Sequence, residues 1–264
     1  MKLREVAVDQ IVQRCRLEMF DYQIDPYTGC EHRCRYCYTL NGYDVQEYGE
    51  IRTSKNLEQQ LAEELSKLEP QTIYIGMDTD PYQPCERTHQ QTRKILSFLA
   101  RCHFSASILT KSDLIIRDRD LLTTMLEPQA GVSIAFHNEQ LRKIFEPDAP
   151  ANEKRVNALR KLKEASIETY TLITPVMPFI TEIEKIIEIV SPYSDAIWIY
   201  RLEIRSTDEK NWQNLRRLID NNFPDLASRF TEVVFSPDHD YWKETRGKLQ
   251  EMNDKYQFNL KIEL

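Results

Sequence analysis

Strand and helix patterns alternate along most of this 264-residue chain, and the alternation limits the folds open to it. Six apolar runs rich in β-branched and aromatic residues predict strands, and five stretches with apolar residues at helical spacing predict helices. The predicted strands are Phe20–Ile24, Thr72–Met77, Ser105–Thr110, Val132–Phe136, Glu168–Ile173 and Ala196–Ile204. The predicted helices are Leu57–Leu68, Thr88–Cys102, Arg119–Leu126, Asn152–Ala165 and Glu182–Val190, preceded in four cases by the possible N-caps Asn56, Asp118, Asn152 and Thr181.

Strict alternation implies parallel strands joined by right-handed helical crossovers. The predicted fold is therefore α/β, a partial (β/α)6 barrel of the TIM type in residues 1–205, with residues 1–19 leading into the first strand. Residues 206–264 are expected to form an α/β extension that packs against the open side of the barrel. Its predicted elements are helix Trp212–Ile219, strand Val233–Phe235, helix Tyr241–Tyr256 and strand Phe258–Ile262.

Three of the six cysteines share one short loop, at Cys30, Cys34 and Cys37. Thiolates spaced in this way select soft metals, meaning zinc or an iron–sulfur cluster. Structural zinc normally has four protein ligands, and no fourth cysteine lies nearby. Three ligands on a four-iron cluster would leave one iron open to a small molecule. The alternative is a zinc-stapled binding module with His32 or a distant residue as fourth ligand, although the short connection between Cys30 and Cys34 hinders a tetrahedron that includes His32.

Charge and composition exclude some classes of protein. The net charge of −7 opposes broad electrostatic capture of nucleic acid, since phosphate neutralisation supplies most non-specific affinity. No apolar run approaches the ~20 residues of a membrane span, and the N-terminus lacks the apolar stretch of a signal peptide. The remaining cysteines, Cys15, Cys85 and Cys102, are scattered, which favours a reducing cytoplasm over a disulfide framework.

With the aromatic Tyr36 just before the last cysteine, the loop resembles the signature of the radical S-adenosylmethionine (SAM) enzymes. Within that superfamily, the chain resembles the spore photoproduct lyase-related proteins, often labelled DNA repair photolyases, over about residues 20–180. Five strings carry this resemblance: Tyr27–Cys34, Asp80–Pro84, Thr110–Asp113, Arg119–Leu122 and Glu146–Pro150.

The resemblance implies a lyase or oxidoreductase with a [4Fe–4S] cluster on Cys30, Cys34 and Cys37. Its open iron would chelate SAM, and one electron, from a donor such as flavodoxin or ferredoxin, would cleave SAM to methionine and a 5′-deoxyadenosyl radical. That radical would abstract a hydrogen atom from a substrate that the sequence does not identify. The runner-up activity is lesion repair in DNA.

The resemblance also implies where SAM would bind. The implied contacts are Tyr36 and Tyr38 beside the cluster, Asp78 and Thr79 for the ammonium group, Lys111 for the carboxylate, Ser133 for the ribose or the carboxylate, and Ile173 for adenine. Each has an ordinary alternative. An Asp-Pro turn needs only backbone geometry, lysine is usually at the surface, and an apolar strand residue usually belongs to the core.

One departure from the group concerns hydrogen transfer. In the true spore photoproduct lyases a cysteine near the end of the second strand donates a hydrogen atom, and Met77 stands at that place here. Cys85, eight residues later, is the candidate catalytic donor, and a half-buried apolar role is its alternative. The departure, the net charge and the basic residues Arg201 and Arg205 on the sixth predicted strand favour a small molecule or small anionic substrate over duplex DNA.

Overall fold

The structure is a computed structural model that describes residues 2–42 and 49–264. The chain forms two compact units that interleave along the sequence. One unit comprises residues 1–32, 44–132 and 153–169, and the other comprises residues 33–43, 133–152 and 170–264. The division falls inside the cysteine loop, directly after His32. The domain boundary predicted after residue 205 remains a prediction.

The first unit is built on a sheet with the strand order β7-β6-β5-β3-β2. Its strands are β2 (Val12–Arg14), β3 (Tyr22–Ile24), β5 (Thr72–Ile75), β6 (Ser105–Thr110) and β7 (Gln129–Ser133). All neighbours are parallel except β2, which runs antiparallel to β3. A separate parallel pair joins β1 (Lys2–Val6) to β4 (Glu50–Ser54).

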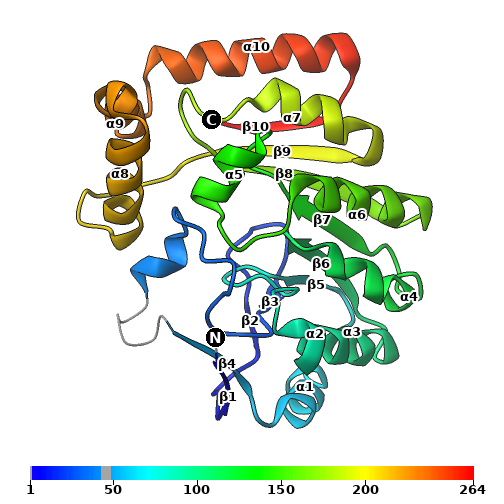
Figure 1. The fold of residues 1–264 in the computed structure, drawn as a ribbon. Coiled ribbons are helices and arrows are strands. Elements are labelled where there is room, and N and C mark those ends of the chain that lie inside the picture. Colours follow the sequence, from blue (N-terminus) through cyan, green and yellow to red (C-terminus); the bar gives the residue numbers. More distant parts are fainter. Residues whose placement is uncertain (1, 43–48) are drawn as a thin grey trace. The chain divides into compact units, whose positions relative to one another are not determined.

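The helices of the first unit bury apolar residues that recur in the sequence at helical spacing. They are α1 (Leu57–Leu65), α2 (Glu86–His89), α3 (Gln91–Arg101), α4 (Arg119–Leu122) and α6 (Asn152–Glu164), with the 3-10 helix η3 (Asp113–Asp118) before α4. Helices α3 and α4 lie along one face of β5 and β6 (Figure 1). On α1, Leu57, Leu61 and Leu65 are all buried, as one face of a helix requires.

Parallel pairing places the functional loops of the first unit together. Ile24 at the end of β3 is in register with Ile75 at the end of β5, and Ile75 is in register with Ile108 of β6. The carboxyl ends of the three strands therefore share one edge, where α/β folds place their chemistry. The loop after β3 carries Cys30, the loop after β5 carries Cys85, and Lys111 follows β6.

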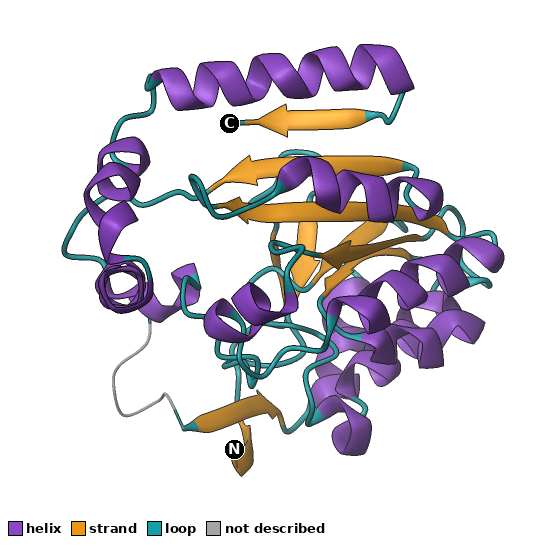
Figure 2. Cartoon of the chain, turned by 45° about the horizontal axis from the view of Figure 1, so that its top comes forward, coloured by secondary structure: helices purple, strands orange, loops and turns teal. Residues whose placement is uncertain are grey.

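The second unit has three parallel strands in the order β10-β9-β8. These are β8 (Glu168–Val176), β9 (Ala196–Arg201) and β10 (Leu260–Glu263). Its helices are α5 (Glu139–Phe145), α7 (Ile183–Val190), α8 (Lys210–Asn222), α9 (Ala227–Val234) and α10 (Asp240–Tyr256), with the 3-10 helices η1 (Tyr38–Asn41), η4 (Ser191–Tyr193) and η5 (Pro224–Leu226). Helix α10 runs alongside β10 (Figure 2).

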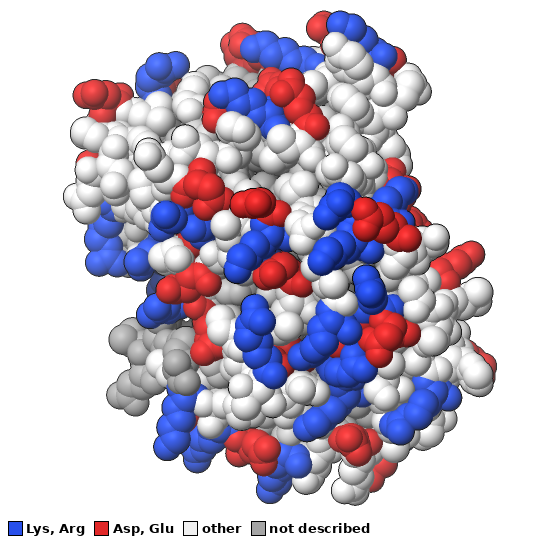
Figure 3. Space-filling model, turned by 45° about the vertical axis from the view of Figure 1, so that its right-hand side comes forward, with Lys and Arg blue, Asp and Glu red and all other residues white. Residues whose placement is uncertain are grey.

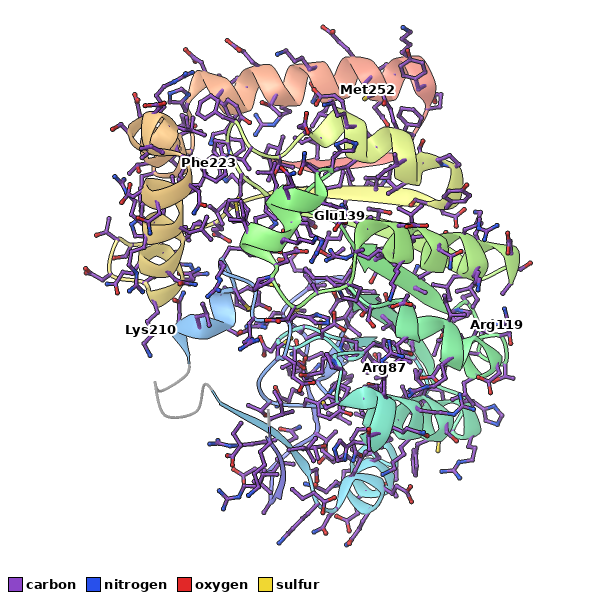
Figure 4. All side chains as sticks on the ribbon, in the orientation of Figure 1. Arg87, Arg119, Glu139, Lys210, Phe223 and Met252 are labelled. Atoms are coloured by element: carbon purple, nitrogen blue, oxygen red, sulfur yellow. The ribbon has the colours of Figure 1, made fainter. Side chains whose placement is uncertain are left out.

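Aromatic rings dominate the core of the second unit. Phe145 at the end of α5 stacks on Phe136 with ring centroids 4.7 Å apart, and on Phe223 at 6.1 Å. Trp212 of α8 stacks on Phe230 of α9 at 6.4 Å. Figure 4 labels Lys210 and Phe223, which mark the start and the end of α8, and Glu139, which begins α5. This core fixes α5, α8 and α9 to one another.

The α/β class and the parallel sheet predicted from the sequence are confirmed, and several element bounds are corrected. The predicted strand Val233–Phe235 is wrong, because Val233 belongs to α9. Phe230, Val233 and Val234 are buried together there, and their spacing of three and four residues is helical. The predicted helix Thr88–Cys102 is two helices, because Gln90 takes a left-handed conformation with φ 52°.

Three strand and cap predictions also change. Strand β9 ends at Arg201 opposite Val176, after a bulge in the β8 pairing, so Arg201 and Arg205 do not alternate along one strand. Strand β7 covers Gln129–Ser133, three residues earlier than predicted. The N-cap of α7 is Glu182, while the hydroxyl of Thr181 accepts the Met177 N–H at 2.9 Å.

Acidic and basic side chains are interspersed on the face of the molecule that Figure 3 shows. This mixture accompanies a net charge of −7. A field of mixed sign does not concentrate polyanions as a broad basic surface does. Among residues 2–42 and 49–264, no helix combines the length and the hydropathy needed to cross a membrane.

The aromatic core of the second unit predicts a stability effect. Phe230→Ala should lower the free energy of unfolding by about 3–5 kcal/mol, because it leaves a cavity beside Trp212 where relaxation is incomplete. Leu126→Ala, at a side chain that is 80% exposed, should change it by less than about 0.5 kcal/mol. Urea unfolding of the three proteins measures both. Equal midpoints for Phe230→Ala and wild type would contradict the packing described.

Candidate active site

The backbone that leads into Cys30 is held by the first unit. Thr28 and Arg52 exchange two backbone hydrogen bonds, at 2.8 and 2.9 Å. Gly29 has φ 85°, and a Cβ at this position would lie 2.8 Å from the carbonyl oxygen of Glu50. A side chain is therefore excluded both by the left-handed conformation and by the close approach. The chain reaches Cys30 along a path that only glycine permits.

Tyr27 anchors the same loop from the other side. Its hydroxyl donates to the carboxylate of Glu86, which is fully buried at the start of α2. Glu86 also accepts from the guanidinium of Arg117 at 2.6 Å and from the Thr92 N–H at 3.0 Å. A buried carboxylate needs such partners to remain charged. The start of the cysteine loop, α2 and η3 are thus all bonded to one carboxylate, that of Glu86.

Asp80 is the second buried carboxylate at this edge. It accepts from the Thr110 hydroxyl at 2.6 Å, the Lys111 N–H at 2.7 Å and the Tyr82 N–H at 2.8 Å. His32 Nδ1 lies 3.3 Å from Asp80 Oδ2, at ion-pair distance but outside hydrogen-bond geometry. Burial acts to raise the pKa of Asp80, yet His32, the Thr110 hydroxyl and the Lys111 N–H lower it well below its ordinary value. Asp80 therefore stays ionised and holds the end of β6.

His32, considered from the sequence as a zinc ligand, is itself buried and turns Nδ1 toward Asp80. The loop after β5 also contains the two residues implied for the SAM ammonium group. The carboxylate of Asp78 pairs with the guanidinium of Arg16, and the hydroxyl of Thr79 donates to the Tyr27 carbonyl at 3.2 Å. Both side chains thus have protein partners, and their role toward SAM stays a prediction.

Asp25, which follows β3, was not singled out from the sequence. Its Oδ1 accepts the Asp78 N–H at 2.9 Å and the Thr79 N–H at 3.0 Å. Burial, and next the charge of Asp78, raise the pKa of Asp25 to about 6. Asp25 fixes the backbone at the end of β5. Only its place directly after a strand could have suggested this role.

Cys85, the candidate hydrogen-atom donor, lies half-buried just before α2, the helix that carries the labelled Arg87 in Figure 4. Its backbone N–H donates to a carboxylate oxygen of Glu31 at 2.6 Å, so Cys85 is fixed next to the residue that follows Cys30. Burial, followed by the charge of Glu31, raises the pKa of the Cys85 thiol to about 12. The thiol therefore keeps its proton at neutral pH.

The second unit holds the later part of the cysteine loop. The Arg35 N–H donates to the Phe145 carbonyl at 2.8 Å, and the Asn214 amide donates to the Arg35 carbonyl at 2.8 Å. The hydroxyl of Tyr36 donates to the buried carboxylate of Glu146. These contacts place Cys34 and Cys37 on either side of a residue that packs against the aromatic core.

The other implied SAM residues differ in exposure. Tyr38 is 48% exposed at the start of η1, and Lys111 is half-buried with its backbone bound to Asp80. Ser133 is buried at the end of β7. Ile173 is fully buried within β8, in register with Ile199, so core packing accounts for it. The contacts of these residues with SAM stay predictions.

The donor atoms of the loop suit an iron–sulfur cluster. None of the six cysteines, which all lie in the described ranges, is in a disulfide, and Cys30, Cys34 and Cys37 are half-buried. In residues 2–42 and 49–264, no three His, Cys, Asp or Glu side chains are grouped around a single metal-ion position. Three thiolates on one short loop match a cubane, in which each cysteine binds a different iron.

Comparisons with known proteins agree with this chemistry. The family model of the radical SAM superfamily matches residues 24–193, which include the whole cysteine loop. An uncharacterized protein of Methanocaldococcus jannaschii is 31% identical over 208 residues, 77% of this chain and 77% of that protein. An uncharacterized protein of Mycobacterium tuberculosis is 24% identical over 231 residues, 81% of this chain and 67% of that protein.

Solved structures show the same fold. A spore photoproduct lyase variant with bound AdoMet and dinucleoside spore photoproduct matches with a TM-score of 0.64 at 17% identity, over 84% of this chain and 66% of that one. Streptococcus suis SuiB bound to the precursor peptide SuiA matches with a TM-score of 0.54 at 14% identity, over 78% and 46%. This chain thus spans about two thirds of the lyase. By its family match and its parallel α/β fold, the chain belongs to the radical SAM superfamily.

Proposed function

We propose that this protein is an enzyme that binds a [4Fe–4S] cluster through Cys30, Cys34 and Cys37 and uses it to cleave SAM reductively. The observation that carries the proposal is the three-cysteine loop inside a region that matches the radical SAM superfamily. When bound, the cluster supplies one electron that splits SAM into methionine and a 5′-deoxyadenosyl radical, which abstracts hydrogen from the substrate. Family membership favours this chemistry over a zinc-stapled module.

The chain's own residues would hold SAM by charge and shape. Lys111 offers a cation to the carboxylate, and its backbone is fixed by Asp80. Asp78 would bind the ammonium group in exchange for Arg16, while Thr79 and Ser133 offer hydroxyl oxygens. Tyr36, Tyr38 and Ile173 supply aromatic and apolar surface for the cluster side and the adenine.

The proposed substrate is a small molecule or small anion. Its support is the net charge of −7, the interspersed charges on the face that Figure 3 shows, and Met77 in place of a donor cysteine. Cys85 is the proposed hydrogen-atom donor, since its position is fixed through Glu31 next to Cys30. The electron would come from flavodoxin or ferredoxin. A reducing cytoplasm suits six cysteines outside disulfides.

Loss of one cluster ligand should abolish the chemistry. Cys34→Ala, reconstituted anaerobically with iron and sulfide, should lose both the visible absorbance of the cluster and 5′-deoxyadenosine formation from SAM, because two thiolates do not hold a cubane stably. Cys102→Ala, outside the loop, should keep both and bind about four irons per chain. A full cluster in Cys34→Ala would refute the ligand assignment.

Removal of Lys111, the proposed partner of the SAM carboxylate, should weaken SAM binding. A charge-assisted hydrogen bond contributes about 1.5–3 kcal/mol, so Lys111→Ala should raise the Kd of the reconstituted enzyme for SAM about tenfold or more. Lys67→Ala, at an exposed lysine of the same unit, should leave the Kd unchanged. Anaerobic titration calorimetry measures each value. Equal Kd values for the two variants would show that Lys111 does not contribute to SAM binding.

Lesion repair is the competing activity, and we expect none. Reconstituted enzyme with SAM and reductant should form 5′-deoxyadenosine yet leave a dinucleotide photoproduct and a lesion-bearing duplex intact. The reasons are Met77, which stands where the lyases carry the donor cysteine, so that Cys85 would have to reach the lesion from another position, and the net charge of −7, which disfavours duplex binding. Chromatography of the lesion before and after incubation gives the answer, and stoichiometric return of thymine pairs would overturn the expectation.

A further inference from the structure

One buried side chain brackets the first cysteine of the loop. Gln83 is fully buried, and its amide bonds the peptide groups on both sides of Cys30. Its Nε2 donates to the Gly29 carbonyl at 3.0 Å, and its Oε1 accepts the Glu31 N–H at 2.9 Å. The two bonds hold the backbone before and after Cys30 as a neighbouring strand would. A glutamine 53 positions away in sequence thus fixes the backbone on both sides of Cys30, just beyond the point where Thr28 pairs with Arg52 of β4.

Gln83 is itself held rigidly. It lies in a turn in which its N–H donates to the Asp80 carbonyl at 3.3 Å, and its own carbonyl accepts the Glu86 N–H at 2.9 Å. The carboxylate of Asp80 is tied to Thr110 and to the backbone of Lys111. The turn that carries Gln83 is therefore anchored to the end of β6 and to α2, so the Gln83 amide has a fixed position from which to bond the backbone around Cys30.

Further contacts restrict the same stretch of backbone. Gly29 is packed against the Glu50 carbonyl, and the Glu31 carboxylate accepts the Cys85 N–H at 2.6 Å. Because the Glu31 N–H is engaged by Gln83, it is not available to a sulfur atom. Backbone donors to sulfur and the orientation of ligands tune the potential and the affinity of iron–sulfur sites. A side chain that fixes both the orientation of Cys30 and the availability of the Glu31 N–H would therefore affect the potential and the affinity of the cluster as well as the stability of the protein.

We infer that Gln83 is a positioning residue, which sets the direction of the Cys30 thiolate and withholds the Glu31 N–H from the cluster. The inference rests on the proposed function, because it assumes that Cys30 is a cluster ligand. Gln83 would act through the two peptide groups that flank Cys30, to which its amide is hydrogen-bonded. A merely structural role would affect stability alone.

Gln83→Met keeps an unbranched side chain of similar length and charge but loses both hydrogen bonds. Gln91→Met is its matched control, because Gln91 is also a buried glutamine of the first unit and its Oε1 has no hydrogen-bond partner among the residues that the structure describes. In metal-free protein, NMR hydrogen exchange of the Glu31 amide should accelerate at least about tenfold in Gln83→Met and stay unchanged in Gln91→Met. Gln83→Glu keeps the acceptor for this N–H and should restore most of the protection.

In reconstituted protein, Gln83→Met should lose iron to a chelator about 10–100 times faster than wild type and shift the g-values of the reduced cluster. Gln91→Met should match wild type in both. If Gln83→Met only lowers the Tm, with the exchange rate, iron loss and g-values of wild type, the inference is overturned. Failure of wild type to assemble a cluster would instead overturn the proposed function, and the exchange rate of Glu31 would still decide whether Gln83 clamps the loop.

Discussion

The parallel register of β3, β5 and β6 is the constraint on which the site in the first unit depends. It brings the carboxyl ends of the three strands to one edge, so that the loops carrying Cys30, Cys85 and Lys111 meet there. Two buried carboxylates then join these loops. Asp80 holds the end of β6, and Glu86 holds Tyr27 and the guanidinium of Arg117. Charges buried in this way are stable only when paired, so the loops cannot move independently without a large energetic cost.

The second unit stabilises the rest of the cysteine loop by a different means. Its aromatic core fixes α5 and α8, and each of these elements supplies a hydrogen bond to the backbone of Arg35. Tyr36 adds a hydroxyl bond to the buried Glu146 and packs against the same core. The part of the loop from Arg33 onward is thus held by backbone and side-chain hydrogen bonds to elements that the aromatic core fixes, and mutations in that core are expected to affect it.

Much of the fold follows from local patterns. Strand Ser105–Thr110 has the predicted bounds, and the buried face of α1 is the leucine spacing seen in the sequence. Val233 shows where a pattern misleads, because three apolar residues fit a strand until their spacing to Phe230 is considered. The cysteine spacing indicated either zinc or an iron–sulfur cluster, and the family match favours the cluster. Asp25 and Gln83 escaped prediction because they act on backbone groups more than 50 positions away, and no local pattern records such contacts.

The central claim is that the cysteine loop holds a cluster with one iron open to SAM. Electron paramagnetic resonance of the anaerobically reconstituted, reduced protein tests it most directly, with spectra recorded before and after SAM is added. A reduced [4Fe–4S] signal that shifts on addition of SAM is predicted, because coordination of a new ligand changes the electronic structure of one iron. A colourless protein that retains zinc, or a cluster whose spectrum SAM leaves unchanged, would contradict the claim.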